Sequence, residues 1–309
     1  MPSWNELLNE FTGQPDDAAR GVWLNEQQFA SLARIAQLRD TPNVLVYASA
    51  FLQKPQAPNI QITHEDVNGF MSTIYGMDFS KPLTLLLHTP GGVTNAAETI
   101  VAYLRSKFSQ GIEVVIPAFA MSAGTMVSLG SDRVWMGRQS QLGPIDPQMP
   151  MPNGRYVSAQ AIVEQFAEAK KDITQDVTRA HAWAPVLQSL GPALLREAEN
   201  ALAYGERMVA DWLERYMMQG LPRTSAESAA RFFNDAGTHK SHGRRIDRDQ
   251  AREQGIVVED IETSQDLQDA VLTSYHLTTI TFENSLAVKA LVSNSGRLYV
   301  KNLPMPQSP

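Results

Sequence analysis

The sequence predicts an α/β protein with a parallel sheet flanked by helices. Short apolar runs with strand character recur between segments whose apolar residues have helical spacing. Two of these runs end in small or turn-forming residues, at 88–92 and 120–125, and a helical pattern follows each of them. Strands that alternate with helices at this spacing are typical of parallel β-structure, because each helix returns the chain to the start of the next strand.

The first half of the chain predicts the elements of that sheet in order. Helices joined by a loop are expected over residues 1–40. The expected strands are short apolar runs, at 43–51, 83–88, 113–118 and 133–136. The expected helices between them lie at 63–75, 94–109 and 123–130. Thr63 is the expected N-cap of the first of these helices.

The second half is predicted to be mainly helical. After a proline-rich loop at 141–153, the expected helices lie at 158–186, 192–219, 225–234, 247–254 and 266–275, and two strands follow at 287–292 and 297–300. We therefore expect an N-terminal helical segment at 1–40, a main domain at 41–260 and a C-terminal helix and strand extension at 261–309.

Composition narrows the classes of function. A net charge of −7 gives no electrostatic footprint for nucleic acid, so we expect no nucleic-acid partner. The chain has no cysteine, which excludes disulfides, thiol catalysis and cysteine-ligated metals. The N-terminal residues lack the pattern of a signal peptide, and no apolar run approaches the ~20 residues of a membrane span. We expect a cytoplasmic protein with no membrane span.

Ser122 is the candidate nucleophile. It lies in the turn Ala120-Met121-Ser122-Ala123-Gly124-Thr125, between a predicted strand and a predicted helix. A serine at the start of a helix lies at the positive end of the helix dipole, where a developing alkoxide is stabilised. Backbone N–H groups of Gly91 or Gly92 and of Ala123 are the candidate oxyanion hole, because glycines let a substrate approach the backbone closely.

Four motifs resemble one known family, and they lie at 88–92, 121–125, 141–148 and 240–244. They are similar to the serine dehydrogenase proteinases, within the Clp peptidase and signal peptide peptidase superfamily. The resemblance covers about residues 40–300. It implies a crotonase-like (Clp peptidase-type) fold, a serine peptidase activity on peptides or unfolded protein, and homo-oligomers. No Gly-x-Gly-x-x-Gly follows a strand, so no nicotinamide site and no cofactor are expected.

Three residues remain candidates for the base that activates Ser122. Clp peptidases carry a histidine after the strand that follows the nucleophile, and this chain has Gly137 there. Signal peptide peptidases use a lysine further along, and Lys170 and Lys171 lie 48 and 49 residues beyond the serine (170−122 and 171−122). A lysine acts as a base only where burial or positive neighbours keep it neutral. His242 lies where Clp peptidases have their third catalytic residue, and it is the rival candidate.

Two further residues have a functional and a structural interpretation. His88 precedes the Gly-Gly turn, and it either orients that turn, lines the substrate groove or is a satisfied, partly buried residue. Asp146 either orients a base or belongs to a rigid loop, and the prolines at 144 and 147 favour the loop. No metal-ligand pattern such as His-Glu-x-x-His appears, so no metal is expected.

The sequence thus predicts a serine peptidase with a Lys or His base and a Gly-Gly oxyanion hole. Two alternatives use the same fold. One is an acyl-CoA-type crotonase-fold enzyme, which would need a carboxylate base such as Glu98 or Glu113 and has no use for the serine turn. The other is a non-catalytic assembly protein, suggested by the missing histidine at Gly137.

Overall fold

The structure is a computed structural model that describes residues 3–151, 154–191 and 193–304. The chain forms two compact units. Unit 1 comprises residues 1–142 and 246–309, and unit 2 comprises residues 143–245. The boundaries expected at residues 40 and 260 both fall inside unit 1. Each unit is described by itself below.

Unit 1 is built on one large sheet. Within its described residues, seven strands are hydrogen-bonded in the order β11-β10-β1-β2-β3-β5-β9. Their bounds are β1 (Asn43–Ser49), β2 (Leu83–His88), β3 (Ile112–Ile116), β5 (Arg133–Met136), β9 (Val258–Asp260), β10 (Ala287–Ser293) and β11 (Leu298–Asn302). Strands β1, β2, β3, β5 and β9 are parallel to one another. Strands β10 and β11 run antiparallel to their neighbours.

The parallel strands form because they can be buried on both faces. Every residue of β1 and of β2 is buried, as expected for continuous apolar runs covered by helices on each side. The predicted α/β class, with a mainly parallel sheet and flanking helices, is confirmed.

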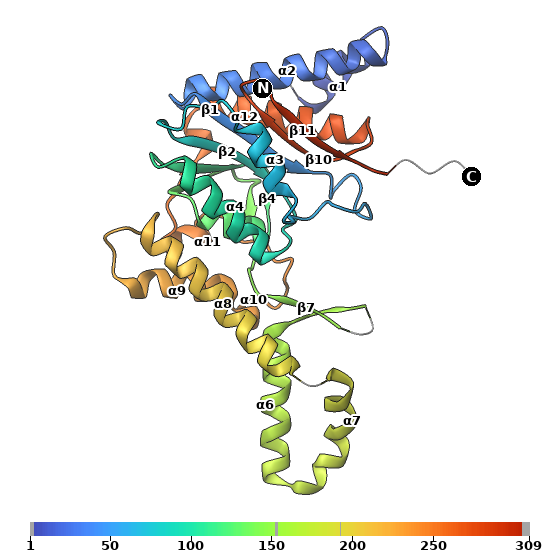
Figure 1. Cartoon of the computed structure of the whole chain (residues 1–309), viewed down its shortest axis with the longest axis vertical. Coiled ribbons are helices and arrows are strands. Elements are labelled where there is room, and N and C mark those ends of the chain that lie inside the picture. The colour runs from blue at the N-terminus through green and yellow to red at the C-terminus, as the bar shows by residue number, and fades with distance from the viewer. Residues whose placement is uncertain (1–2, 152–153, 192, 305–309) are drawn as a thin grey trace, which may run out of the picture. The chain divides into compact units, whose positions relative to one another are not determined.

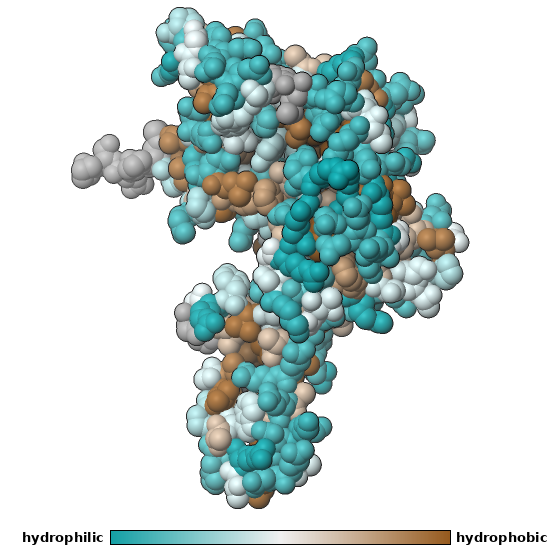
Figure 2. Space-filling view, turned by 180° about the vertical axis from the view of Figure 1, so that it is seen from behind, coloured by the Kyte–Doolittle hydropathy of each residue, from teal (hydrophilic) through white to brown (hydrophobic). Residues whose placement is uncertain are grey.

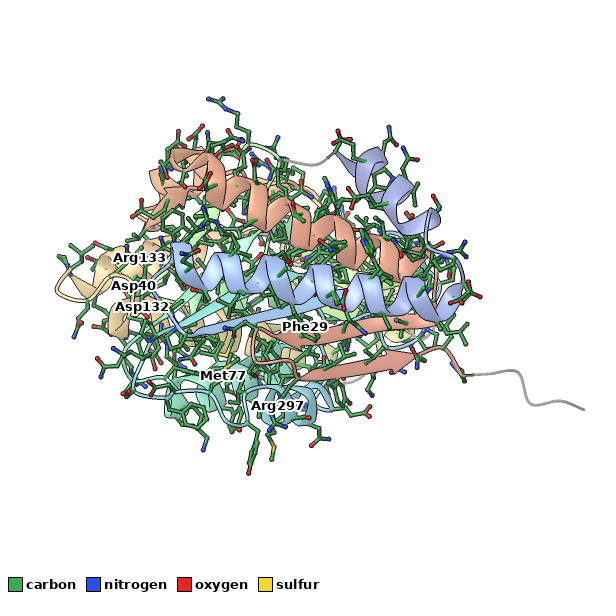
Figure 3. All side chains as sticks on the ribbon, turned by 90° about the horizontal axis from the view of Figure 1, so that it is seen from above. Phe29, Asp40, Met77, Asp132, Arg133 and Arg297 are labelled. Atoms are coloured by element: carbon green, nitrogen blue, oxygen red, sulfur yellow. The ribbon has the colours of Figure 1, made fainter. Side chains whose placement is uncertain are left out.

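Helices cover both faces of this sheet (Figure 1). On one face, α2 and α12 pack together over β1 and β10, and Leu32, Val46 and Val271 belong to the same buried cluster. Figure 3 shows Phe29 of α2 pointing toward the strands. On the other face, Phe70 of α3 stacks on Tyr47 of β1 at 5.6 Å between ring centroids. The helices of unit 1 are α1 (Trp4–Thr12), α2 (Asp17–Leu38), α3 (Asp66–Thr73), α4 (Thr94–Lys107), α5 (Ala123–Leu129), α11 (Arg248–Glu253), the 3₁₀-helix η2 (Ile261–Thr263) and α12 (Gln265–Glu283).

Three local predictions in unit 1 need correction. The strand expected at 113–118 ends at Ile116, because Pro117 has no N–H to donate, and a two-residue strand β4 (Phe119–Ala120) follows and pairs with β6 (Gln141–Leu142). Thr63 is not an N-cap: its N–H instead donates to the Asp66 carboxylate. Helix α12 continues past residue 275 to Glu283.

Unit 2 is a helical unit with a small hairpin. Its elements are β7 (Gln148–Pro150), β8 (Tyr156–Ser158), α6 (Ala159–Gln175), the 3₁₀-helix η1 (Val177–Arg179), α7 (Ala180–Leu190), α8 (Leu194–Arg215), α9 (Arg223–Asn234) and α10 (Ala236–His239). The helix expected at 158–186 is interrupted at Asp176, which caps η1. Pro192, where the next helix was expected to begin, lies outside the described residues. Ile162, Leu194 and Ala198 form a small apolar core, and hydrophobic residues also reach the surface of this unit (Figure 2).

No helix in the described part of the chain is long and apolar enough to cross a membrane.

Candidate active site

Ser122 lies in a strained turn between β4 and α5. Its φ of +50° and ψ of −115° make it one of the few non-glycine residues with positive φ in the described structure. Its carbonyl accepts the first hydrogen bond of α5 from Met126 N at 3.0 Å, and Gly124 N donates to Met121 O at 2.7 Å. Such a conformation costs about 1–3 kcal/mol and persists where the surrounding structure enforces it, often at functional sites. The turn presents a half-buried serine hydroxyl, which makes no hydrogen bond within the described residues of unit 1.

The Gly-Gly turn lies directly against the serine turn, as the motifs predict. Thr89 N donates to Phe119 O at 2.9 Å, and Met121 N donates to Thr89 O at 3.1 Å, so the two segments are paired. Gly91 has a φ of +98°, and a Cβ added to it would lie 2.6 Å from both Met121 O and Ser122 Cβ. Only glycine therefore fits at this point of contact.

Two backbone N–H groups at this contact are available to an oxyanion. Ile62 pairs with the Gly-Gly turn, since Ile62 N donates to Gly91 O at 2.7 Å and Val93 N donates to Ile62 O at 2.9 Å. The N–H of Gly92, between these two bonds, points to the opposite edge of the segment. Neither this N–H nor that of Ala123 makes a hydrogen bond within the described residues of unit 1.

Replacing Gly91 with alanine is expected to lower kcat for peptide hydrolysis by about 100-fold or more, because the new Cβ would push the Ser122 turn out of position. Gly76→Ala is the matched control. Gly76 also has positive φ, at +85°, but the nearest atom to an added Cβ is a side-chain nitrogen 4.0 Å away. The control should lose about 1–2 kcal/mol of stability and keep its kcat. Equal kcat in the two variants would contradict the packing argument.

His88 is buried beneath the turn. Its exposed fraction is 3%, and its ring lies within 6 Å, centroid to centroid, of Phe51, Phe119 and Tyr275. Neither ring nitrogen has a hydrogen-bond partner within the described residues, and burial lowers the pKa of His88 from 6.5 to about 3. The expected substrate-binding role of His88 is therefore corrected. An imidazole covered by aromatic rings has no surface with which to touch a substrate.

This burial predicts a specific loss of stability in acid. As the pH falls below 6.5, the unfolded chain binds a proton on His88 while the folded protein does not until about pH 3. The free energy of unfolding of the wild type should therefore fall by about 2–3 kcal/mol more than that of His88→Phe between pH 6.5 and 4.5. A cavity of about 10 Å³ lies beside His88, and the surrounding aromatic rings suit the apolar phenylalanine. Urea unfolding at the two pH values measures this difference, and parallel curves would rule the explanation out.

In unit 2, the structure pairs His242 with Asp146. His242 Nδ1 lies 2.7 Å from Asp146 Oδ1, and the second oxygen, Oδ2, accepts from Gln148 Nε2 at 2.6 Å. A carboxylate only accepts, so Nδ1 carries the proton of this bond, and in the neutral imidazole Nε2 keeps its lone pair. Asp146 is 2% exposed, whereas His242 is 31% exposed, and its Nε2 makes no hydrogen bond within the described residues of unit 2.

The loop that carries Asp146 is rigid and anchored. Prolines lie on both sides, and Ile145 N donates to Phe233 O at 2.8 Å. The structure thus agrees with the loop interpretation of Asp146, and the hydrogen bond to His242 is the contact that the base-orienting interpretation requires. Sequence reasoning found the loop but did not pair Asp146 with His242, because the two are 96 residues apart (242−146) and no local pattern links them.

Lys170 and Lys171 lie near the end of α6, and both are exposed. Neither has the burial that keeps a lysine neutral. Within the described residues, no group of three or more histidines, aspartates or glutamates is arranged to hold a metal ion.

Comparison with known proteins agrees with the motifs. Residues 51–181 match the family of ClpP-like SDH-type serine proteinases. The resemblance predicted from the sequence is thus confirmed over the segment that contains both turns and Asp146. At the level of the family, the match is to serine peptidases.

Two uncharacterized proteins of Methanocaldococcus jannaschii are similar to this chain. They are 35% identical over 117 residues and 32% identical over 110 residues. The alignments cover 38% and 36% of this chain, and 39% and 36% of the relatives. The chain therefore spans well under half the length of the curated relatives it matches.

Two solved structures also match. A mutant of the membrane-bound stomatin-specific protease 1510-N is 21% identical, with a TM-score of 0.39 over 64% of this chain and 75% of its own. A mutant of ClpP1 from Listeria monocytogenes is 15% identical, with a TM-score of 0.34 over 76% of this chain and 99% of its own.

Proposed function

We propose that this protein is a serine peptidase in which Ser122 is the nucleophile, His242 is the general base and Asp146 orients the base. The observation that carries the proposal is the Asp146–His242 hydrogen bond, which leaves Nε2 free to accept a proton. The strained Ser122 turn, packed against a glycine turn with two N–H groups available, supplies the other half of the chemistry.

Chain connectivity supports the partnership of these residues. The strand β4 runs into the Ser122 turn, and it pairs with β6 at Leu142. Leu142 and Ile246 exchange two backbone hydrogen bonds of 2.9 Å, so both connections to unit 2 leave from beside β4. Asp146 lies four residues after Leu142 and His242 four residues before Ile246 (146−142 and 246−242). Four residues span at most about 14 Å, which bounds how far Asp146 can lie from Leu142 and His242 from Ile246.

The proposed reaction follows from these roles. His242 Nε2 takes the proton of Ser122 as Oγ attacks the peptide carbonyl, and the N–H groups of Gly92 and Ala123 stabilise the resulting oxyanion. The imidazolium then gives its proton to the leaving amine, and an acyl-enzyme remains on Ser122. Water, activated by the same imidazole, hydrolyses the ester and frees the serine. Asp146 holds the imidazole in the required tautomer throughout.

The lysine alternative has less support. A lysine that accepts the serine proton needs a buried environment, and Lys170 and Lys171 are both exposed. We therefore propose His242 as the base. Homo-oligomers remain part of the proposal, and light scattering of the purified protein tests them.

A fluorescent fluorophosphonate, which reacts with activated serines, tests the proposed function. We expect the wild type, Lys170→Ala and Lys171→Ala to be labelled, Ser122→Ala not to be labelled, and His242→Ala to be labelled far more slowly. If labelling depends on one of the lysines and not on His242, that lysine is the general base instead of His242. No labelling of the wild type between pH 6 and 10 would instead favour the acyl-CoA or the non-catalytic alternative.

A further inference from the structure

A buried ion pair in unit 1 has no part in the reaction as written above. Lys289 of β10 and Asp66 of α3 are both 0% exposed, and Nζ lies 2.7 and 2.8 Å from the two carboxylate oxygens. The hydroxyl of Tyr47, on β1, donates to Asp66 Oδ2 at 2.8 Å. Removing two charges from water is costly, so such a pair is weak evidence for stability and calls for another reason.

The pair holds both sides of one residue, Ile62. Lys289 Nζ donates to Gln61 O at 2.7 Å, and Thr63 N donates to Asp66 Oδ2 at 2.8 Å. The flanking backbone groups of Ile62 are therefore bound by the two charged side chains. Ile62 itself is 1% exposed.

The loop that ends at Ile62 has few apolar anchors of its own. In residues 51–61, all of which the structure describes, no residue is fully buried. Lys54 holds the start of the loop through the carbonyls of Ser285 and Ala287, each at 2.7 Å. At the end of the loop, the ion pair adds polar anchors on both sides of the buried Ile62 side chain.

The backbone of Ile62 packs against the Gly-Gly turn and is hydrogen-bonded to it. Its N–H and C=O bond Gly91 O and Val93 N, on either side of Gly92. A Cβ added to Gly92 would lie 2.3 Å from Ile62 O, so the two backbones are in direct contact. These bonds occupy one edge of the turn and leave the Gly92 N–H on the other.

We propose that Lys289 and Asp66 are positioning residues, which brace Ile62 against the Gly-Gly turn and so hold the Gly92 N–H in place for the oxyanion. The inference rests on the proposed function, in which Gly92 supplies that N–H. An oxyanion donor stabilises the transition state more than the bound substrate, so a misplaced donor lowers kcat rather than raising KM.

The double variant Lys289→Met/Asp66→Asn tests the brace without leaving an unpaired buried charge. Asparagine keeps an oxygen for Tyr47 and Thr63, but the tie to Gln61 O is lost. We expect kcat for peptide hydrolysis to fall about tenfold or more while KM stays within about twofold. Amide hydrogen exchange should speed up at Ile62 and Val93, whose N–H groups make the bonds to the turn.

The matched control removes another ion pair, which lies near the amino end of β2, whereas the Gly-Gly turn follows its carboxyl end. Arg39 binds Glu113 through two hydrogen bonds of 2.7 Å, at the amino ends of the strands, where Figure 3 shows Asp40, Asp132 and Arg133. Arg39→Met/Glu113→Gln should destabilise the protein but leave kcat and exchange at the turn unchanged.

The outcomes separate the brace from the proposed function. Normal kcat and normal exchange at Ile62 and Val93 in the Lys289 variant would overturn the brace. Equal losses of kcat in the variant and in its control would also overturn it, because general destabilisation would explain both. An inactive, unlabelled wild type would overturn the proposed function and the catalytic role of the brace together, while the exchange measurement would still decide whether the ion pair holds the turn.

Discussion

Ser122→Ala is expected to lower kcat for peptide hydrolysis by about a million-fold and to abolish fluorophosphonate labelling, while leaving the free energy of unfolding within about 2 kcal/mol of the wild type. The expected loss is large because, in the proposed reaction, no other group forms the acyl-enzyme, and the N–H groups of Gly92 and Ala123 then have no covalent intermediate to stabilise. The effect is measured as the rate at which new amino termini are released from an unfolded protein substrate.

A second serine in the same helix provides the control. Ser128 lies in α5, six residues after Ser122, and its hydroxyl donates to Gly124 O at 2.9 Å inside the core. Ser128→Ala should be labelled and should turn over substrate at nearly the wild-type rate. A Ser122→Ala protein that keeps more than about 1% of the wild-type kcat would show that another group is the nucleophile.

Asp146→Asn is expected to lower kcat by about 10,000-fold with little change in KM. The amide group of the new asparagine can donate a hydrogen bond to His242 Nδ1. That bond stabilises the tautomer in which Nε2 carries the proton, and this tautomer cannot accept a proton from Ser122. His242→Ala should lose most of the rate as well.

The lysines give the matched comparison for that experiment. Lys170→Ala and Lys171→Ala remove exposed charges from α6, and each should keep kcat within about twofold and show an unchanged pH profile. If Asp146→Asn were as active as these two variants, the Asp146–His242 bond would have no catalytic role, and the base would have to be sought elsewhere.

The strands and the two turns were readable from sequence because their signals are local. Strands β2 and β5 begin and end at the predicted residues or within one of them, since a buried parallel strand is a continuous apolar run bounded by turn residues. The two turns were predicted as one site, and the structure brings them together through the pairing of Thr89 with Ala120 in β4, a strand outside the seven-stranded sheet. The strand β9 escaped prediction, because Val258–Asp260 is three residues long and two of them are acidic.

The remaining features of the site depend on residues far apart in the chain. The pairing of His242 with Asp146 joins two loops of unit 2, and the brace on the Gly-Gly turn joins β10, α3 and the loop before α3. Burial could not be predicted from the sequence either. His88 ends an apolar strand and Lys170 lies on a helix, and neither pattern shows which side chain is covered.

Periodicity and turn chemistry are properties of neighbouring residues, so the α/β class, the family resemblance and the candidates Ser122, Gly91 and Gly92 could be predicted from the sequence. The partner of His242, the exposure of the lysines, the burial of His88 and the contacts of Lys289 came from the folded chain. These depend on which side chains are removed from water together, and that is a property of the packed chain rather than of any segment of it.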